Sequence, residues 1–187
     1  LVGPSGSGKS TFVNLLLRLA EPSSGRILID GIDIRRYTRA SLRRAFGVVP
    51  QEPMLFAVSV RENIAYGRPE ASADEVEAAA RAARAHEFIV DLAHGYDTEL
   101  GERAATLSGG QRQRLCLARA LVKQPAVLLM DEPTAAVDPR SARLIHEAVA
   151  RVHQGRTLLV ITHDTRALAG YHRVITLDGG RIADARP

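Results

Sequence analysis

Apolar residues along this chain fall into short continuous runs that are separated by longer amphipathic stretches. Continuous runs occupy residues 46–49, 127–130 and 157–161, and residues 139–152, between the last two runs, have apolar side chains at helical spacing. Continuous apolar strands that alternate with amphipathic helices are typical of a parallel sheet covered on both faces. The pattern therefore predicts an α/β fold. The apolar stripe of the helix consists of Ala142, Ile145, Ala148, Val149 and Val152.

More helices are predicted before and after the first of these runs. A helix is predicted over residues 9–19, where the apolar residues Phe12, Leu15, Leu16 and Leu19 follow helical spacing. The other predicted helices are residues 59–66, 73–85 and 108–122, the second opened by a Ser72…Glu75 capping box. Between them, residues 26–29 alternate like a short strand and precede Asp30-Gly31, a dipeptide typical of hairpin turns. The middle of the chain is thus mainly helical.

Length and composition limit the function classes. With 187 residues, the chain can bury one substantial core, and we expect a single domain over residues 1–187. No apolar run approaches the roughly 20 residues of a membrane-spanning helix, so a role at a membrane requires a partner. The first residues, Leu1-Val2-Gly3, lack both an initiator Met and a leader, so we expect the chain to be part of a longer protein. The single cysteine, Cys116, excludes an internal disulfide framework.

The charges do not indicate a nucleic-acid partner. The net charge is +4, but the 25 cations are scattered among 21 acids instead of forming one basic tract. Nearly all of the cations are arginines, and Lys9 and Lys123 are the lysines. A lysine within a glycine-rich loop therefore stands out, which directs attention to Lys9.

The glycine-rich loop at residues 3–10 carries the clearest chemical signal. Gly-Pro-Ser-Gly-Ser-Gly-Lys-Ser matches the phosphate-binding pattern GxxxxGK[ST], between a strand end and a helix start. In such a loop, backbone N–H groups surround phosphate oxygens, the lysine reaches the β- and γ-phosphates of ATP, and the hydroxyl of Ser10 ligates Mg²⁺. A flexible turn that contains a lysine by chance is the alternative. The residues expected to bind nucleotide here are Gly3, Pro4, Ser5, Gly6, Ser7, Gly8, Lys9, Ser10 and Thr11.

Two carboxylates follow the apolar run at residues 127–130. Asp131 and Glu132 would therefore lie at the carboxyl edge of the sheet, where ligands of α/β proteins bind. Asp131 suits a magnesium ion, directly or through water. Glu132 could orient or deprotonate the attacking water, a role worth about 10²–10⁴-fold in rate. The alternative is that this acidic pair caps a helix.

The sequence Leu107-Ser108-Gly109-Gly110-Gln111, taken with the two motifs above, resembles the signature of ATP-binding cassette proteins. Alone, this sequence could be a helix N-cap followed by flexible glycines. The resemblance extends over nearly the whole chain and implies a P-loop ATPase that dimerises head to tail around ATP. In that family the signature loop contacts the γ-phosphate held by the opposite subunit. The resemblance therefore implies that nucleotide held by the other subunit is contacted by Ser108, Gly109, Gly110 and Gln111.

Weaker features agree with this resemblance. Gln51 resembles the glutamine that senses magnesium and contacts the transmembrane partner, although a lone glutamine is more often a surface residue. His163 resembles the switch histidine that contacts the γ-phosphate, although it could instead cap the next helix. Residues 98–103, Thr-Glu-Leu-Gly-Glu-Arg, resemble the loop typical of exporters. This loop is the main reason to expect export through a transmembrane domain, at the cytoplasmic face of a membrane.

The chain departs from the family pattern at two places. Ala135 stands where the family usually has a serine, while Asp138, expected to contact nucleotide across the dimer, is retained. The chain also begins directly before the phosphate loop, so the preceding strands and the aromatic residue that stacks on adenine are not in it.

The combined prediction is an α/β P-loop ATPase with a mostly parallel sheet covered by helices and an inserted helical subdomain at about residues 51–124. The expected catalytic residues are Glu132, His163 and Lys9, and the expected magnesium ligands are Ser10, Gln51 and Asp131. The rival interpretations are a cassette ATPase of DNA repair or chromosome organisation, a cassette-type translation factor, and a silent half-site that only binds ATP. The long coiled-coil or zinc insertions of the first rival are absent from this sequence.

Overall fold

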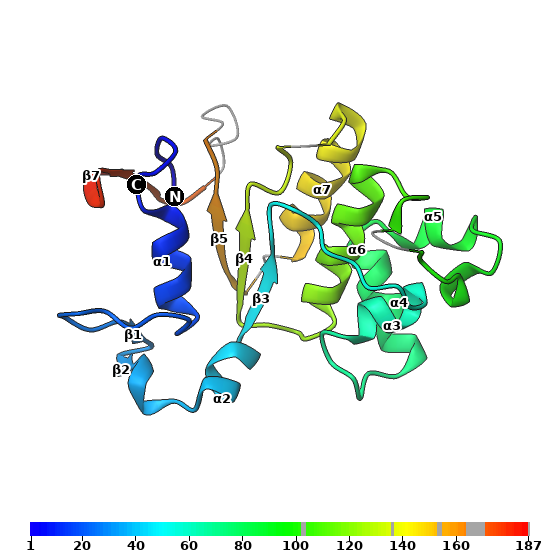
Figure 1. The fold of residues 1–187 in the computed structure, drawn as a ribbon, viewed down its shortest axis with the longest axis horizontal. Coiled ribbons are helices and arrows are strands. Elements are labelled where there is room, and N and C mark those ends of the chain that lie inside the picture. Colours follow the sequence, from blue (N-terminus) through cyan, green and yellow to red (C-terminus); the bar gives the residue numbers. More distant parts are fainter. Residues whose placement is uncertain (102–103, 136, 153–154, 164–170, 187) are drawn as a thin grey trace.

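A computed structural model describes residues 1–101, 104–135, 137–152, 155–163 and 171–186 of the chain (Figure 1). It contains both helices and strands. In chain order the elements are α1 (Lys9–Leu16), β1 (Leu28–Ile29), β2 (Ile32–Asp33), the 3₁₀ turn η1 (Ile34–Arg36), α2 (Arg39–Arg44), β3 (Phe46–Val49), α3 (Val60–Ala65), α4 (Ala73–Ala82), α5 (His86–Val90), η2 (Gly95–Asp97), α6 (Gly109–Leu121), β4 (Val127–Asp131), α7 (Pro139–Val152), β5 (Thr157–Ile161), β6 (Val174–Asp178) and β7 (Arg181–Arg186).

The predicted parallel sheet is confirmed. Its strands lie in the order β3-β4-β5, and both pairs are parallel. The chain start extends this sheet, because Val2 forms parallel bridges to Thr162, just after β5, and to Thr176 in β6. The carboxyl ends of these strands therefore meet at one edge, and the loop that follows Val2 starts at the same edge.

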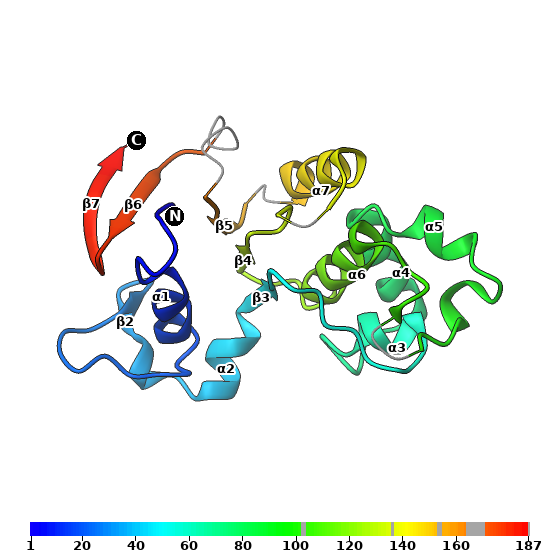
Figure 2. The same ribbon diagram turned by 45° about the horizontal axis from the view of Figure 1, so that its top comes forward.

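Helices cover both faces of the sheet, as predicted (Figures 1 and 2). On one face, Val13 of α1 packs in a buried cluster with Leu129 and Ile161. On the other face, the sheet residues Leu128 and Met130 belong to a larger cluster that includes side chains of α6 and α7. Figure 2 shows α1 on one side of β3, β4 and β5, with α6 and α7 on the other.

Capping boxes open the helices α3, α4 and α6. In each, a serine side chain accepts a hydrogen bond from the backbone N–H three residues later, and a Glu or Gln side chain accepts from the serine N–H. The Ser72…Glu75 box that the sequence predicts is one of them. Such caps satisfy N–H groups that have no partner within the helix. α4 ends at Ala82, earlier than predicted, and Arg84 then takes a left-handed conformation with a φ of 56°.

The prediction for the first helix was wrong in its length. α1 ends at Leu16 instead of residue 19, and Arg18 turns the chain with a φ of 48°. Phe12 and Leu19, which follow the helical spacing, are 37% and 61% exposed. The sheet instead packs against Val13, on a neighbouring face of the helix. Helical spacing alone permitted more than one face, and the sheet decided between them.

Several elements were not predicted. The antiparallel hairpin of β6 and β7 turns at Gly179 and Gly180, which have φ values of 52° and 77°. The short helix α2 and the 3₁₀ turns were also missed. Cys116 is buried and has no disulfide, as expected. Within the described residues, no helix combines the length and apolar character needed to cross a membrane.

Candidate functional site

The glycine-rich loop leaves the sheet at Val2. The N–H of Val2 donates to the carbonyl oxygen of Ile175, and its carbonyl oxygen accepts from the N–H of Leu177, both in β6. Gly3 follows, and a Cβ at this position would lie 2.3 Å from the carbonyl oxygen of Leu177, so a side chain does not fit. Gly8 has a φ of 104° and caps α1 without a side chain. The first N–H groups of α1 therefore face outward with the positive end of the helix dipole, which favours a bound anion.

Lys9 lies over this loop. Its ammonium donates hydrogen bonds to the carbonyl oxygens of Gly3, at 2.8 Å, and Pro4, at 2.9 Å. In the described part of the chain it has no carboxylate within 4 Å. The hydroxyl of Ser7, in the same loop, is buried without a hydrogen-bond partner among the described residues and does not line the cavity. A cation and outward N–H groups in one loop fit a phosphate group.

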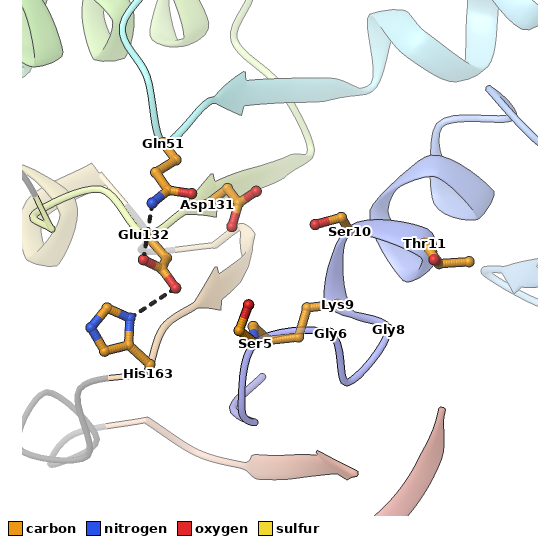
Figure 3. A pocket seen from close by; sticks show the side chains of 10 residues that line it. All are labelled: Ser5, Gly6, Gly8, Lys9, Ser10, Thr11, Gln51, Asp131, Glu132 and His163. Atoms are coloured by element: carbon orange, nitrogen blue, oxygen red, sulfur yellow. Dashed lines mark hydrogen bonds and ion pairs between the residues drawn. The ribbon is translucent and has the colours of Figure 1, made fainter. Parts of the chain in front are cut away.

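The opposite wall comes from the carboxyl end of β4. Consecutive side chains of a regular strand point to opposite faces, yet Asp131 and Glu132 both line the same cavity (Figure 3). The reason is that Glu132 has a φ of 42°, in the left-handed region, which interrupts the alternation. A non-glycine residue in this region is strained, and such strain is commonly found at functional sites.

The Glu132 carboxylate is held by groups that follow the two neighbouring strands. His163, after β5, contacts Oε1 through Nδ1 at 2.8 Å. Gln51, after β3, donates from Nε2 to Oε2 at 3.3 Å. Figure 3 shows both side chains directed at Glu132, across the cavity from the glycine-rich loop. The ends of β3, β4 and β5 thus bring together three residues that are far apart in sequence.

Asp131, the last residue of β4, has a raised pKa. Burial at the cavity wall and the neighbouring Glu132 carboxylate raise the pKa of Asp131, while the Lys9 ammonium opposes the rise. Two adjacent carboxylates that disfavour each other's charge favour a cation beside them. With the hydroxyl of Ser10 on the same cavity, the donor set is made of oxygens, which suits Mg²⁺.

These residues enclose a cavity of about 460 Å³, within the range of small-molecule sites. The structure therefore brings together most of the predicted site. The lining residues are Ser5, Gly6, Gly8, Lys9, Ser10, Thr11, Gln51, Asp131, Glu132 and His163. Gly3, Pro4 and Ser7 belong to the loop but do not line the cavity.

The predicted signature residues are not part of this cavity. Ser108 caps α6, its hydroxyl accepting from the N–H of Gln111 at 3.2 Å, while the Gln111 side chain accepts from the Ser108 N–H at 2.8 Å. Gly110 packs against α7, where an added Cβ would lie 2.0 Å from the hydroxyl oxygen of Ser141. These residues and Gly109 therefore lie at a helix start that is separate from the cavity.

Asp138 also lies outside the cavity. Its carboxylate accepts from the N–H of Ser141 at 3.0 Å in the first turn of α7. Hydrogen bonding from the Ser141 side chain, and then from its backbone, lowers the pKa of Asp138. The contact is that of a helix cap. Of the predicted exporter loop, the structure describes residues 98–101, in which Glu99 forms a bridge with Ser59. Glu102 and Arg103 of that loop, and Ala136 near Asp138, lie outside the described residues.

The sequence analysis did not predict one contact that holds the glycine-rich loop in place. The tip of the β6–β7 hairpin holds the glycine-rich loop, because the N–H of Gly180 donates to the carbonyl oxygen of Ser7 at 3.0 Å. Residues 174–177, Val-Ile-Thr-Leu, are rich in β-branched side chains and precede Asp-Gly-Gly, and this was the sequence signal for the hairpin. The pairing with a loop near the other end of the chain has no local signal.

Comparisons with known proteins agree with this geometry. The sequence profile of a family described as ABC transporter matches residues 1–135. The chain is 49% identical to the mitochondrial potassium channel ATP-binding subunit of Pongo abelii over 99% of this chain and 26% of the relative. It is 48% identical to ABC transporter B family member 1 of Arabidopsis thaliana, over 98% of this chain and 14% of the relative.

A solved structure is similar as well. A bacterial Atm1-family ABC exporter, determined with ATP bound, superposes with a TM-score of 0.92 and 49% sequence identity. The match covers 98% of this chain and 32% of the exporter chain. The chain thus spans between about a seventh and a third of the length of these relatives. The profile and the relatives show that this chain belongs to the ABC transporter family.

Proposed function

We propose that this chain supplies the energy for export across a membrane by binding ATP in the cavity described above and hydrolysing it. The observation that carries the proposal is the position of Lys9 and the open start of α1 on one wall, opposite Gln51, Asp131, Glu132 and His163. We further propose that residues 1–187 act as one ATPase domain in which residues 51–124 form the helical subdomain.

Each wall has its own role. Lys9 and the N–H groups of the glycine-rich loop bind the phosphates, with contributions from the loop residues 3–8 and Thr11. Glu132 accepts a proton from the attacking water at a carboxylate oxygen. The contacts of Glu132 with His163 and Gln51 hold that carboxylate in place. Because ionised carboxylate and phosphate oxygens only accept hydrogen bonds, Nδ1 of His163 donates to Glu132, and the proposed contact of Nε2 with the γ-phosphate requires a proton on Nε2 as well.

Magnesium binding is assigned to Ser10, Gln51 and Asp131. When bound, Mg²⁺ neutralises charge on the β- and γ-phosphates. The chain's part is to present oxygen donors from the two walls, the Ser10 hydroxyl from α1 and the Asp131 carboxylate from β4.

The signature residues complete the site of a second copy or a paralogue. Ser108, Gly109, Gly110 and Gln111 form a helix start outside the cavity, which supports a role on nucleotide held by another subunit. A serine hydroxyl has one donor and two acceptor positions, so the cap that Ser108 makes with Gln111 leaves its O–H available for a phosphate. Asp138 would contribute from the adjacent start of α7.

The partner that uses the energy is a transmembrane domain. The relatives named exporters and transporters are longer than this chain, which supports a membrane domain in the same or a separate chain. Gln51 and residues 98–103 would contact it, at the cytoplasmic face of the membrane. No observation favours the DNA-repair or translation alternatives.

Replacing Lys9 by alanine tests the proposed phosphate site. We expect ATP affinity to fall at least about tenfold, because a charge-assisted contact to the phosphates is lost. Lys123→Ala is the matched control, since Lys123 also donates to two backbone carbonyls but lies away from the cavity. Titration with a fluorescent ATP analogue measures both variants. Equal affinities in the two variants would remove the basis for the proposal.

A mixing experiment tests the dimer. Gly109→Asp places a carboxylate where the partner's γ-phosphate would lie, so this variant should not hydrolyse ATP, although its own phosphate loop is intact. Lys9→Ala instead has a damaged phosphate loop and an intact signature. In a mixed dimer, one composite site combines both defects and the other contains only unaltered parts.

Hydrolysis should therefore return in part when the two inactive variants are mixed. The measurement is phosphate release at a constant total protein concentration, with each variant alone as the control. If Gly109→Asp by itself weakens monomeric ATP binding as much as Lys9→Ala does, the signature acts within its own subunit and the head-to-tail arrangement is wrong.

A further inference from the structure

The segment that carries Gln51 has no regular structure and depends on side chains for its support. It starts at Pro50, directly after β3, and among the described residues no backbone–backbone hydrogen bond is formed by residues 51–56. Gln51 is exposed, so packing does not hold its side chain, yet that side chain reaches the Glu132 carboxylate at 3.3 Å. The direction of Gln51 is therefore set by the backbone that precedes it.

The backbone in front of Gln51 is held by Gln113, a residue of α6. Gln113 is 2% exposed, and its Nε2 donates to the carbonyl oxygen of Pro50 at 3.0 Å. A carbonyl oxygen only accepts hydrogen bonds, so the amide nitrogen of Gln113 must face it. A buried polar group that loses its partner is not compensated by water, and this favours one arrangement of the pair.

This hydrogen bond sets the path of the chain into Gln51. The carbonyl of Pro50 and the N–H of Gln51 belong to one planar peptide unit, which also contains the Cα of Gln51. The proline ring fixes φ of Pro50, and the bond from Gln113 then fixes ψ, the remaining rotation that orients this unit. The Cα of Gln51 is thereby placed relative to β3 and α6.

Side chains of α6 also hold the other end of the segment. Arg119 donates to the carbonyl oxygen of Met54 at 2.7 Å, and Sγ of Cys116 lies 3.9 Å from the same oxygen. Residues 113, 116 and 119 are spaced three apart and therefore lie along one side of the helix. Of these three residues, Gln113 is the one that contacts the neighbour of Gln51.

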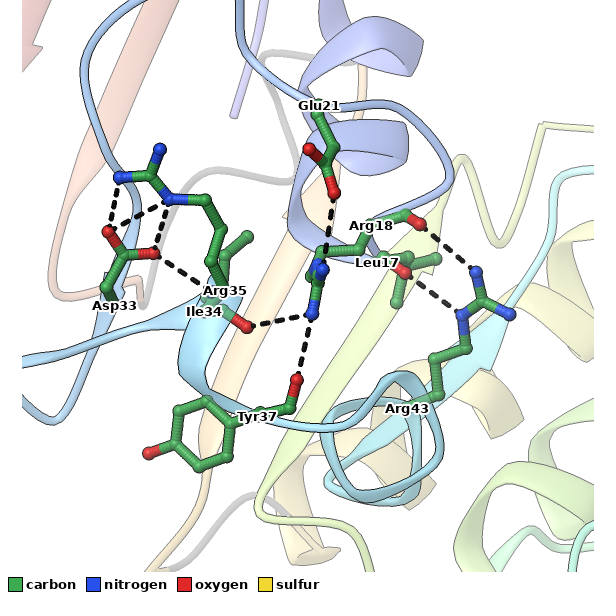
Figure 4. Close-up of polar contacts among 8 residues, drawn as sticks. All are labelled: Leu17, Arg18, Glu21, Asp33, Ile34, Arg35, Tyr37 and Arg43. Atoms are coloured by element: carbon green, nitrogen blue, oxygen red, sulfur yellow. Dashed lines mark hydrogen bonds and ion pairs between the residues drawn. The ribbon is translucent and has the colours of Figure 1, made fainter.

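The end of α1 is held in place by a different kind of donor. In Figure 4, the guanidinium of Arg18 donates to the carbonyl oxygens of Ile34 and Tyr37, and it also pairs with Glu21. A guanidinium has five N–H groups, so it can keep one bond while another partner shifts. The uncharged amide of Gln113 has two N–H groups and donates to the carbonyl of Pro50 from a buried position. Its contact is therefore the more exacting of the two.

We propose that Gln113 is a positioning residue for ATP hydrolysis, which directs the Gln51 side chain at Glu132 through the carbonyl of Pro50. The inference rests on the proposed function, in which Glu132 is the general base and Gln51 holds its carboxylate, and it adds the residue that aligns Gln51. Gln113 does not line the cavity, so it acts on turnover through Gln51 and not on the affinity for ATP.

Gln113→Met tests this proposal in the intact protein, because methionine is also unbranched but has no N–H donor. We expect kcat to fall about 5–50-fold, since a small misplacement at the reacting centre is costly, while KM for ATP changes less than about twofold. Cys116→Ala is the matched control, because it alters a buried residue of the same helix that does not contact Pro50. Phosphate release at varied ATP concentration measures both constants, and thermal unfolding compares the stabilities.

A double-mutant cycle with Gln51→Ala separates positioning from a structural role. If Gln113 acts through Gln51, Gln113→Met should change kcat less than about twofold in a chain that already carries Gln51→Ala. A merely structural residue would lower kcat by the same factor in both backgrounds. Gln113→Leu serves as the second apolar variant if Gln113→Met does not fold.

An unchanged kcat in Gln113→Met overturns the proposal. So does an equal loss with and without Gln51→Ala, or an equal loss in Cys116→Ala. Glu132→Gln is measured beside these variants, because near-normal turnover in it would show that the proposed function names the wrong base. Loss of turnover in both Glu132→Gln and Gln51→Ala, without a loss in Gln113→Met, disproves the positioning role alone.

Discussion

The glycine-rich loop and the start of α6 are both glycine-containing helix starts, but they are built differently. Gly8 caps α1 without a side chain, and Lys9 and Ser10 follow directly at the cavity. At α6, a complete capping box of Ser108 and Gln111 satisfies the first N–H groups, and no residue of this start lines the cavity. The first start is open toward a ligand, and the second is already satisfied within its own helix.

This difference indicates how binding and stability are divided in the molecule. A helix start that keeps its N–H groups unpaired is available for an anion and contributes less to its own stability. A capped start is stable alone and can be placed against another molecule as a preformed surface. Substitutions in the cavity should therefore change catalysis and nucleotide binding, while substitutions at the start of α6 should mainly change stability of the isolated chain.

The largest expected effect is on the cavity side. Glu132→Gln should lower ATP turnover by about 10²–10⁴-fold, because an amide cannot accept the proton of the attacking water. ATP affinity should be unchanged, so closed dimers with bound nucleotide should accumulate. The control is Glu52→Gln, the same change at an exposed residue outside the cavity. Phosphate release and size-exclusion chromatography measure the two effects. Near-normal turnover in Glu132→Gln would mean that another group is the base.

A smaller effect is expected where α6 meets α7. Gly110→Ala places a Cβ 2.0 Å from the Ser141 hydroxyl oxygen, so the two helices must move apart, at a cost of about 1–3 kcal/mol of unfolding free energy. Gly101→Ala is the control, because a Cβ there meets no atom within 4 Å. Urea unfolding measures stability, and nucleotide titration should show unchanged ATP affinity. A loss of affinity without a loss of stability contradicts the division described above.

The smallest effect concerns the cap of α7. Hydrogen bonding to Ser141 lowers the pKa of Asp138 in the folded chain. The stabilising contribution of the Asp138 carboxylate is therefore fully present above the pKa that Asp138 has in the unfolded chain. This contribution is lost as the pH falls through the lower pKa that Asp138 has in the folded chain. We therefore expect parent and Asp138→Asn chains to differ slightly in stability near neutral pH and to converge below about pH 4. Thermal unfolding across this range is the measurement. A stability difference that does not depend on pH would mean that the charge of Asp138 is not what stabilises the start of α7.

Local patterns in the sequence predicted the elements that surround the site. The runs that became β3, β4 and β5 were recognisable because a strand buried on both faces is continuously apolar. From there, the carboxyl ends of parallel strands had to bring Gln51, Glu132 and His163 to one edge, although the roles of these residues remain predictions. The phosphate loop was predicted because its glycines and lysine must be neighbours in sequence.

The parts that were missed depend on distant contacts. The buried face of α1 was set by Leu129 and Ile161, which no periodicity within residues 9–19 can reveal. Likewise, the support of Ser7 by Gly180 joins opposite ends of the chain. The left-handed conformation of Glu132 was also not predicted, since glutamate has no preference for it.

That conformation of Glu132 has a consequence for protein engineering. A residue with a Cβ costs about 1–2 kcal/mol in the left-handed region, and glycine removes this cost. A screen that rewarded only heat resistance would therefore favour Glu132→Gly and discard the general base that we propose. At this position, selection for stability and selection for turnover act in opposite directions. A stabilised variant of this chain must therefore keep Glu132 while improvements are sought at other residues.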